Sequence, residues 1–406
     1  MLAGCMSPAV PAAPEVPRPA PTPSAAVPLA GALNETGLRI FRAAAGDTNL
    51  AVSPVSLGLA FGMVDAGASG PVDAALQELF AYPAEGESLL SAFNSLDLGV
   101  SSEKGDGAEN ALGDTVDLPI VRVANSAWFD DRVTPDPTYV DKVQTWFGAE
   151  ATTAPLVDDP AGSRERIDAW VKDRTEGLIP HVMPVDVPRP ETRFILVNTV
   201  YLKAQWWDPF AAEVTSEEDF HLAGGGTATA ELMTHGTYAD YVLTDDYDAV
   251  ALRYVGDLEM LVVVPHEGAF TQVRDGLDAA VLADIDAGLE NGHVLVRLPK
   301  FSTESAVDLA DVIENGVGVS GLFRTIGLDG IGPELEVGAA VHATKVIVDE
   351  KGTEAAAATV VEGAAGAAPP EFDAEIVADH PFLYVIRDRG TGAILFVGQY
   401  VDPAGA

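Results

Sequence analysis

The sequence predicts a single α+β domain that contains more than one β-sheet. With 406 residues, 48% of them hydrophobic, the chain can bury a large core. Helical and strand-like patterns follow one another without the strict strand–helix–strand rhythm of a parallel α/β sheet. After residue 33 no linker is long enough to separate two domains. We therefore expect one mixed domain over residues 33–403.

Residues 1–32 differ from the rest in composition and are expected to form a disordered tether. Residues 7–28 are rich in Pro and Ala, as in linkers that hold a domain at a distance. Before them, the phrase Leu-Ala-Gly-Cys ending at Cys5 resembles the lipobox of bacterial lipoproteins. Only Met1 precedes this phrase, so the basic and apolar regions of a signal peptide are missing. Either the start has been assigned too late or the match is chance.

A genuine lipobox would place the protein outside the cytoplasm, and this is the location we expect. The protein would then be secreted, or held at the cell surface by a membrane tether through lipidated Cys5. Cys5 is also the single cysteine of the chain. An internal disulfide and a cysteine-based zinc site are therefore excluded.

The first part of the predicted domain alternates helices with a short strand. Residues 33–45 have helical spacing, and residues 49–52 form a short strand. Ser53-Pro54 is a typical helix start, followed by a helix over 55–66 that is rich in small residues. A second helix is expected over 71–80. Small side chains in the helix over 55–66 allow neighbouring backbone to approach closely.

The middle of the chain contains two strands and two helices after a polar loop. Residues 101–114 are rich in Gly, Ser and acidic residues and indicate a loop. Residues 120–128 alternate as a strand, and residues 139–147 and 164–174 are helical in spacing. Residues 193–202 are almost continuously apolar. A run of this kind is typical of a strand that is covered on both faces.

The C-terminal part is predicted to be mostly strands. Helices are expected over 270–289 and 308–314. Strands are expected over 249–254, 259–265, 293–301, 337–349, 382–387 and 394–400. Gly256 lies in the short turn of the first hairpin, and Gly390 lies in the turn of the last one.

Charge and missing motifs exclude several classes of function. The chain has 62 acidic and 23 basic residues, a net charge of −39, so it repels phosphates and nucleic acid is excluded as a partner. The Gly-x-Ser-x-Gly, His-Glu-x-x-His and phosphate-loop patterns are absent. The seven histidines are scattered without metal-ligand spacing. We expect no metal, no cofactor and no enzymatic activity.

Residues 349–372 are unusual for a segment so close to the end of a folded chain. A charged turn leads into a run of Thr and Ala, which gives way to Gly, Ala and Pro. One interpretation is a flexible surface loop. The other is a segment that changes conformation, with side chains small enough to enter a sheet between two strands.

Short phrases along residues 33–403 decide between these interpretations, because together they resemble the serpins, a family of protease inhibitors that work by loop insertion. The phrases are Asn49, Ser53-Pro54-x-Ser56, Asn125, Ile167-Asp168-x-Trp170-Val171, Thr175-x-Gly177-x-Ile179-Pro180, Asn198, Tyr201, Lys203, Trp206, Phe210, Thr215, Phe220, Leu298-Pro299-Lys300-Phe301, His342, the segment 350–359, Asp379-His380-Pro381-Phe382 and Leu395-Phe396-x-Gly398. The chain departs from the family at Ala204, where Gly is usual, and in a few extra residues between Thr359 and Asp379.

The resemblance implies a fold of three β-sheets surrounded by about nine helices, with an exposed reactive-centre loop at about 350–372. A target serine protease would cut this loop and be trapped as a covalent 1:1 acyl complex while the loop inserts into the main sheet. A monomer that is not itself an enzyme is implied. Two other functions remain open: a non-inhibitory serpin that is cleaved as a decoy or carrier, and a surface adhesion lipoprotein.

The start of the loop has the side chains that insertion requires. In a strand, alternate residues share a face, and the resemblance to the family implies that one such set faces the protein core. The side chains of this set are small and uncharged, and the set follows Gly352, which can serve as a pivot. The hinge consists of Glu350, Gly352, Thr353, Ala355, Ala357 and Thr359.

Two further groups of residues have roles implied by the resemblance alone. The first is a polar cluster beneath the centre of the main sheet, called the shutter, which lets the strands part: Ser53, Ser56, Asn198 and His342. The second, the breach, lies at the top of the sheet, where insertion starts: Trp206, Thr215, Lys300 and Glu350. An ion pair is expected between Glu350 and Lys300.

The composition of the loop narrows the target protease. Family spacing from Gly352 places the scissile bond at Gly366-Ala367, with Ala365-Gly366 as the alternative. No Lys or Arg lies between Lys351 and Arg387, which excludes trypsin-like cleavage. No large apolar side chain lies between Gly352 and Glu371 either. Ala, Gly and Val suit the shallow pockets of elastase-like or subtilisin-like proteases.

Overall fold

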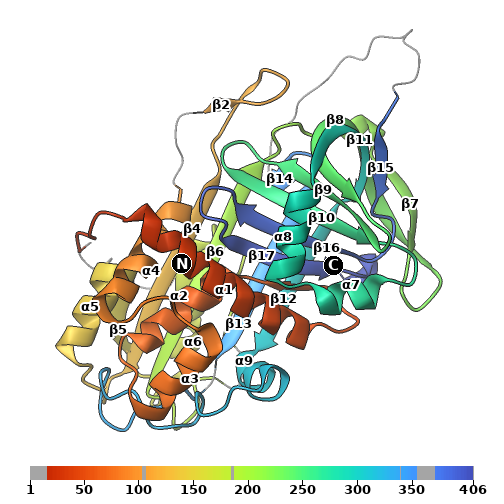
Figure 1. Ribbon diagram of the computed structural model, residues 1–406. Coiled ribbons are helices and arrows are strands. Elements are labelled where there is room, and N and C mark those ends of the chain that lie inside the picture. Colours follow the sequence, from red (N-terminus) through yellow and green to blue (C-terminus); the bar gives the residue numbers. More distant parts are fainter. Residues whose placement is uncertain (1–15, 103–106, 184–186, 339, 354–370, 406) are drawn as a thin grey trace, which may run out of the picture.

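The computed structural model describes residues 16–102, 107–183, 187–338, 340–353 and 371–405. These residues form an α+β fold with nine α-helices, a nine-stranded sheet, a six-stranded sheet and a two-stranded ribbon. The predicted fold class is therefore confirmed. Figure 1 shows the long strands of the six-stranded sheet crossing the middle of the molecule, with most helices toward the lower left and the nine-stranded sheet toward the upper right.

The six-stranded sheet carries the segment on which the functional prediction rests. Its strand order is β12-β13-β14-β6-β4-β5. The bounds are β4 Ile120–Asp130, β5 Glu150–Ala154, β6 Phe194–Gln205, β12 Phe301–Asp308, β13 Val341–Asp349 and β14 Gly352–Thr353. Neighbouring strands are antiparallel except β4 and β5. The two-residue strand β14 lies between two long strands.

The nine-stranded sheet has the order β1-β17-β16-β10-β9-β8-β11-β15, with β7 paired to β8. The bounds are β1 Leu50–Val52, β7 Ser216–His221, β8 Thr227–Leu243, β9 Tyr247–Arg253, β10 Leu258–Pro265, β11 Glu290–Pro299, β15 Ala374–Val377, β16 Phe382–Asp388 and β17 Ile394–Tyr400. The ribbon pairs β2 Ala108–Glu109 with β3 Thr115–Val116. Every residue of β10 and β17 is buried, which agrees with their mostly apolar sequences; Glu259 and Gln399 are the polar exceptions.

Several helices begin with Pro in the first turn, where the missing N–H costs no hydrogen bond. The α-helices are α1 Pro23–Ala44, α2 Pro54–Asp65, α3 Gly70–Phe80, α4 Gly86–Val100, α5 Pro137–Phe147, α6 Pro160–Arg174, α7 Phe270–Gly276, α8 Ala279–Gly288 and α9 Leu309–Asp311. Short non-α turns follow at Ala212–Val214, Val312–Val317 and Pro403–Gly405. Helix α2 is buried along most of its length, as its small residues predicted.

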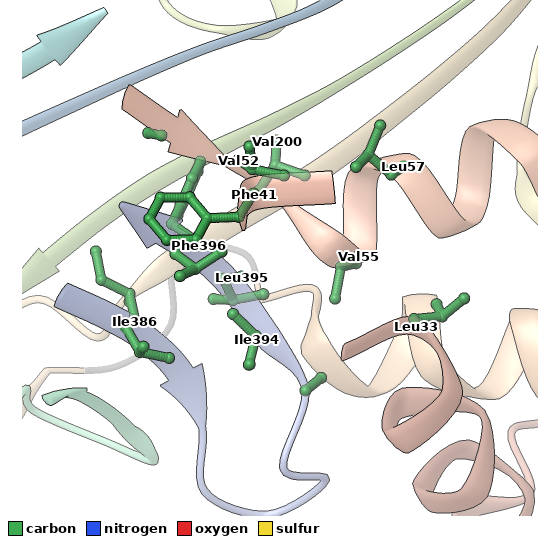
Figure 2. Close-up of a cluster of buried hydrophobic side chains, with 14 of the residues drawn as sticks. Leu33, Phe41, Val52, Val55, Leu57, Val200, Ile386, Ile394, Leu395 and Phe396 are labelled. Carbon is green, nitrogen blue, oxygen red and sulfur yellow. The ribbon is translucent and has the colours of Figure 1, made fainter. Parts of the chain in front are cut away.

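The main core lies where α1 and α2 meet strands of both large sheets. Figure 2 shows Phe41 of α1 beside Val52 of β1 and Phe396 of β17, with Val55 of α2 and Val200 of β6 nearby. All five side chains are buried. Because α2 packs against both sheets here, its N-terminal end is fixed relative to β6 and β13.

Helix α1 corrects the prediction for the N-terminal tail. It begins at Pro23 rather than at residue 33, so residues 23–32 are not a disordered tether. Ala26, Leu29 and Ala30 are buried in line with Leu33, because they continue its apolar face by helical spacing. The composition rich in Pro and Ala hid this face from the sequence analysis.

The segment just before α1 is also held against the domain. Arg18 donates to Asn94 Oδ1 at 2.9 Å, to Asp97 Oδ2 at 2.6 Å and to the Trp146 carbonyl at 2.9 Å. The Thr22 amide donates to Ser95 Oγ at 2.8 Å. Residues 16–22 therefore pack on α4 and the end of α5. Cys5 lies outside the described residues.

Other elements also differ from the predictions: strands β5, β7, β8 and β15 were not predicted, and the strand expected over 337–349 begins at Val341. Residues 86–100 form α4, although no element was predicted there. The helix expected over 270–289 is two helices, because Leu277 is buried in an extended conformation and Asp278 caps α8 by accepting the Val281 amide. The strand expected over 293–301 ends at Pro299 as β11, and Phe301 begins β12.

Candidate functional site

Strand β14 is the start of the predicted loop, and it is already inserted into the six-stranded sheet. Thr353 pairs with Val348 of β13 and with Ala204 of β6. Gly352 precedes it with φ +146°, and a Cβ at this position would collide with the Ala204 carbonyl oxygen. Only glycine fits this position, because the backbone takes a conformation that other residues avoid and passes directly against β6.

The Thr353 side chain is enclosed beneath the end of the sheet. Its hydroxyl lies 2.7 Å from the hydroxyl of Tyr254, and both side chains are buried. The Tyr254 ring stacks on Trp206 with 4.3 Å between centroids and 11° between planes. Burial raises the pKa of Tyr254 well above its ordinary value, so this phenol stays neutral and can donate. A small hydroxyl side chain at 353 is therefore well accommodated.

A tight turn over residues 349–351 leads into β14, and the segment after β6 holds it. Trp206 donates from its ring to the Asp349 carbonyl at 3.0 Å and from its amide to the Lys351 carbonyl at 2.8 Å. The Phe210 amide donates to the Glu350 carbonyl at 2.9 Å. The conformation of the turn is thus tied to two aromatic residues.

The structure brings the four predicted breach residues together around this turn. The Thr215 hydroxyl donates to Glu350 Oε1 at 2.9 Å, and Lys300 Nζ lies 3.6 Å from the same oxygen. The Glu350 side chain is only 14% exposed, so its charge is poorly solvated and depends on these partners. Lys300 also lies 3.6 Å from Glu231, whose side chain is 58% exposed.

The structure also brings the predicted shutter residues together, at the N-terminal end of α2. The Ser53 amide donates to His342 Nε2 at 2.9 Å, and the Ser56 hydroxyl donates to Asn198 Oδ1. Asn198 Nδ2 in turn donates to Asn125 Oδ1 at 2.5 Å. These bonds connect α2 to β13, β6 and β4.

His342 is buried and neutral at physiological pH. Burial lowers its pKa to about 4, because the protein interior disfavours the charged imidazolium. A cavity of about 100 Å³ lies beside it, with Asn198, Ser56 and Ala340 among its lining residues. The lining comes from β6, from β13 and the segment before it, and from helix α2 beneath them. This part of the sheet therefore has space between its two long strands.

Two residues of the site were not predicted to belong to it. Asn125 extends the shutter network to β4, and its side chain also donates to the Phe147 carbonyl at 3.1 Å. Tyr254 lies under Thr353. Asn125 was among the residues that resemble the serpin family, but it was given no role in the site, and no pattern in the sequence indicated Tyr254.

Several predicted site residues lie outside the described residues. They are Ala355, Ala357 and Thr359 of the hinge, Ala365, Gly366 and Ala367 at the scissile bond, and Cys5. In the part of the chain that the structure describes, no group of three or more His, Cys, Asp or Glu residues could hold a metal ion. No helix there is long and apolar enough to cross a membrane.

Comparison with known proteins identifies the family. Residues 31–403 match the family model described as serpin (serine protease inhibitor). A serpin-like protein of Thermococcus kodakarensis is 32% identical over 381 residues, covering 93% of this chain and 86% of that protein. The leukocyte elastase inhibitor of Bos taurus is 30% identical over 369 residues, covering 87% of this chain and 93% of that protein.

A solved structure supports the same assignment at the level of the fold. The native thermophilic serpin tengpin superposes with a TM-score of 0.80 at 21% identity, covering 92% of this chain and 94% of that one. The sequence match extends over both large sheets and over the hinge between β13 and β6. This chain belongs to the serpin family of serine protease inhibitors.

Proposed function

We propose that this protein inhibits an elastase-like or subtilisin-like serine protease as a suicide substrate that traps the protease by loop insertion. The observation that carries the proposal is the position of β14. Its two residues are already paired on both sides, between Val348 and Ala204, so an entering loop would extend an existing strand. Propagating a strand is easier than starting one, and speed matters because the acyl-enzyme must be trapped before it hydrolyses.

The loop composition supports a protease with a shallow primary pocket. Near the expected scissile bond Gly366-Ala367 the sequence offers only Ala, Gly, Val, Pro and Glu. One methylene in such a pocket changes binding by about 1–3 kcal/mol, so several proteases of this class would be inhibited. The bovine relative at 30% identity is named as an inhibitor of leukocyte elastase, which agrees with this class.

Incubation with pancreatic elastase and with subtilisin tests the proposal. We expect a covalent 1:1 complex that survives denaturing gel electrophoresis, together with a released C-terminal fragment that begins at residue 367 or close to it. Trypsin provides the control, because it has no basic residue to cut between Lys351 and Arg387. Complete loop cleavage by both enzymes without any complex would reject inhibition of these two proteases.

Thermal unfolding before and after loop nicking separates an inhibitor from a cleaved decoy, a carrier or an adhesion protein. Insertion extends β14 into a full strand of the six-stranded sheet and should raise the melting temperature sharply. A serpin that is cleaved without insertion would keep its melting temperature. Light scattering on the same samples would test our proposal that the native protein is a monomer.

We further propose that the protein acts outside the cytoplasm, either secreted or tethered to a membrane through Cys5. The support is the Leu-Ala-Gly-Cys phrase that ends at Cys5. Metabolic labelling with a radioactive fatty acid should mark the wild-type protein and leave a Cys5→Ala variant unlabelled. Equal labelling of both would remove the case for lipidation.

A further inference from the structure

A second cavity of about 100 Å³ lies next to the hinge turn and has no role in loop insertion described above. It lies between the segment after β6 and strands β8 and β9. Its volume equals roughly three water molecules at liquid density, which suits a small head group rather than a whole drug-sized molecule. Its walls include Trp206 and Phe210, the two residues whose amides hold the hinge turn.

Exposed aromatic side chains surround the mouth of this pocket. Trp207 is 44% exposed and Tyr238 is 76% exposed, and both line the cavity. Trp207 is held in place, since its amide donates to the Arg253 carbonyl at 2.8 Å and its carbonyl accepts the Ala111 amide at 2.8 Å. Large aromatic faces that remain exposed around a cavity are typical of binding sites.

A carboxylate, Asp208, lies in the wall of the pocket and is well placed to neutralise a cation. Its Oδ2 accepts the Thr237 hydroxyl at 2.6 Å and lies 2.9 Å from His235 Nε2. Burial raises the pKa of Asp208, but the nearby His235 and the hydrogen bond from Thr237 outweigh this effect and hold it below its ordinary value. In the described part of the chain both contacts are made by Oδ2, so Oδ1 can accept further hydrogen bonds.

One arginine in the wall of the pocket is already paired with a carboxylate. Arg253 NH2 lies 3.0 Å from Asp240 Oδ2, and Asn291 Nδ2 donates to the other oxygen of Asp240 at 2.9 Å. All three residues line the cavity. Asp240 is therefore already neutralised within the wall, whereas Asp208 has no Lys or Arg partner in the described part of the chain.

We propose that this pocket binds a guanidinium or alkylammonium group, with Asp208 as its counter-charge and Trp207 and Tyr238 as aromatic walls. Cation–π contact with such rings contributes from about 0.5 to 2 kcal/mol, depending on desolvation. The group could belong to a free small cation or to a Lys or Arg side chain of a bound protease. The chemistry required of the pocket is the same in both cases.

The chemistry is tested with n-butylguanidinium and with n-butylurea, its neutral analogue of nearly equal shape. Titration is followed by tryptophan fluorescence, because Trp206 and Trp207 line the cavity. We expect a saturable change with butylguanidinium and none with butylurea at the same concentrations. A charged hydrogen bond of about 1.5–3 kcal/mol implies that Asp208→Asn weakens binding by at least about tenfold.

Two further variants make this test decisive. Tyr238→Ala, at a position that is 76% exposed, should also weaken binding of butylguanidinium. Asp158→Asn, which removes an exposed carboxylate paired with Arg132, should leave binding unchanged. Equal responses to the charged and neutral probes, or full binding by Asp208→Asn, would overturn the proposal.

Association rates with a protease then identify the source of the cation, and this second arm rests on the proposed function. If Tyr238→Ala slows complex formation about tenfold at unchanged stoichiometry, the pocket takes a basic side chain of the protease. If the rate is unchanged while butylguanidinium still binds, the pocket takes a free small cation. If the wild-type protein forms no complex with a protease, the proposed inhibition is rejected. The butylguanidinium titration still tests whether the pocket binds a cation.

Discussion

The Ser53 amide donates a hydrogen bond to Nε2 of His342 over 2.9 Å, although 289 residues separate them in the chain. The bond joins the start of α2 to the first residues of β13, since His342 is the second residue of that strand. It requires Nε2 to be unprotonated, because only the lone pair of a neutral imidazole can accept. The low pKa of this histidine, about 4, is consistent with that requirement.

Acid should therefore weaken the native state through His342. The pKa is about 4 in the folded protein, against about 6.5 for an ordinary histidine. At pH values above 6.5 the group is neutral in both states and its full contribution is present. As pH falls from about 6.5 to about 4 the unfolded state binds a proton first, so the free energy of unfolding decreases by up to about 3 kcal/mol.

Urea unfolding of wild type and His342→Gln at pH 7.5 and 4.5 measures this effect. The loss of stability between the two pH values should be clearly smaller in the variant. The matched control is His221→Gln, at an exposed position, which should keep the wild-type pH dependence. Identical pH dependence in His342→Gln and wild type would contradict the assignment.

Glu350→Lys should make the protein polymerise on mild heating. The substitution places a second cation beside Lys300 and removes the acceptor of the Thr215 hydroxyl, at a side chain that is only 14% exposed. The turn that leads into β14 would then be released. Size-exclusion chromatography after heating measures the monomer that remains.

Glu231→Lys is the matched control for this variant. Glu231 lies at the same 3.6 Å from Lys300, but it is 58% exposed and is not part of the hinge. It should stay monomeric under conditions in which Glu350→Lys forms polymers. Monomeric Glu350→Lys protein after the same heating would show that this ion pair does not restrain the hinge.

Thr353→Arg should turn the inhibitor into a simple substrate. The Thr353 side chain is buried between Ala204 and Val348, with its hydroxyl against Tyr254. A charged side chain of greater volume cannot enter this space without losing its solvation. We expect complete cleavage by elastase with no stable complex on denaturing gels.

Thr353→Ser keeps the hydroxyl and the small volume and serves as the control, with the wild-type yield of complex. If Thr353→Arg traps protease as well as this control does, insertion through position 353 is not the mechanism.

Arg18→Gln should destabilise the protein by about 3–5 kcal/mol. The variant leaves the Asp97 carboxylate almost fully buried without its cation, and uncompensated buried charges are costly. The double variant with Asp97→Asn should recover part of the loss.

Arg132→Gln breaks an exposed pair with Asp158 and should change stability by less than about 0.5 kcal/mol. Urea midpoints compare the variants, and an Arg18→Gln midpoint equal to that of Arg132→Gln would show that residues 16–22 do not stabilise the domain.

Sequence patterns predicted elements correctly where a short stretch of residues by itself shows the run of apolar side chains or the turn. The apolar run over 193–202, the start of α2 at Ser53-Pro54 and the hairpin of β16 and β17 all correspond to elements of the structure. The missed helix α4 was also detectable, since Leu89, Phe93 and Leu96 follow helical spacing.

The remaining features depend on contacts between distant parts of the chain. Residues 23–32 pack on the domain as a helix; their apolar spacing is visible in the sequence, but the composition rich in Pro and Ala favoured a linker. Ser53 and His342 are 289 positions apart in the chain and are brought together by the folded sheet. Their grouping was predicted from the resemblance to serpins and not from spacing. Tyr254 had no such support and was missed.

The register of β14 determines which residues any further insertion would bring into contact. Thr353 is paired with Val348 on one side and with Ala204 on the other. If this antiparallel pairing continues, Thr359 comes opposite His342 and Asn198 at once, six positions along each of the three strands. Its hydroxyl would arrive beside two polar side chains that already have partners on α2 and β4. The polar cluster would then favour this register, because a loop shifted by one residue would place Ala358 or Val360, which have no hydroxyl, opposite His342 and Asn198.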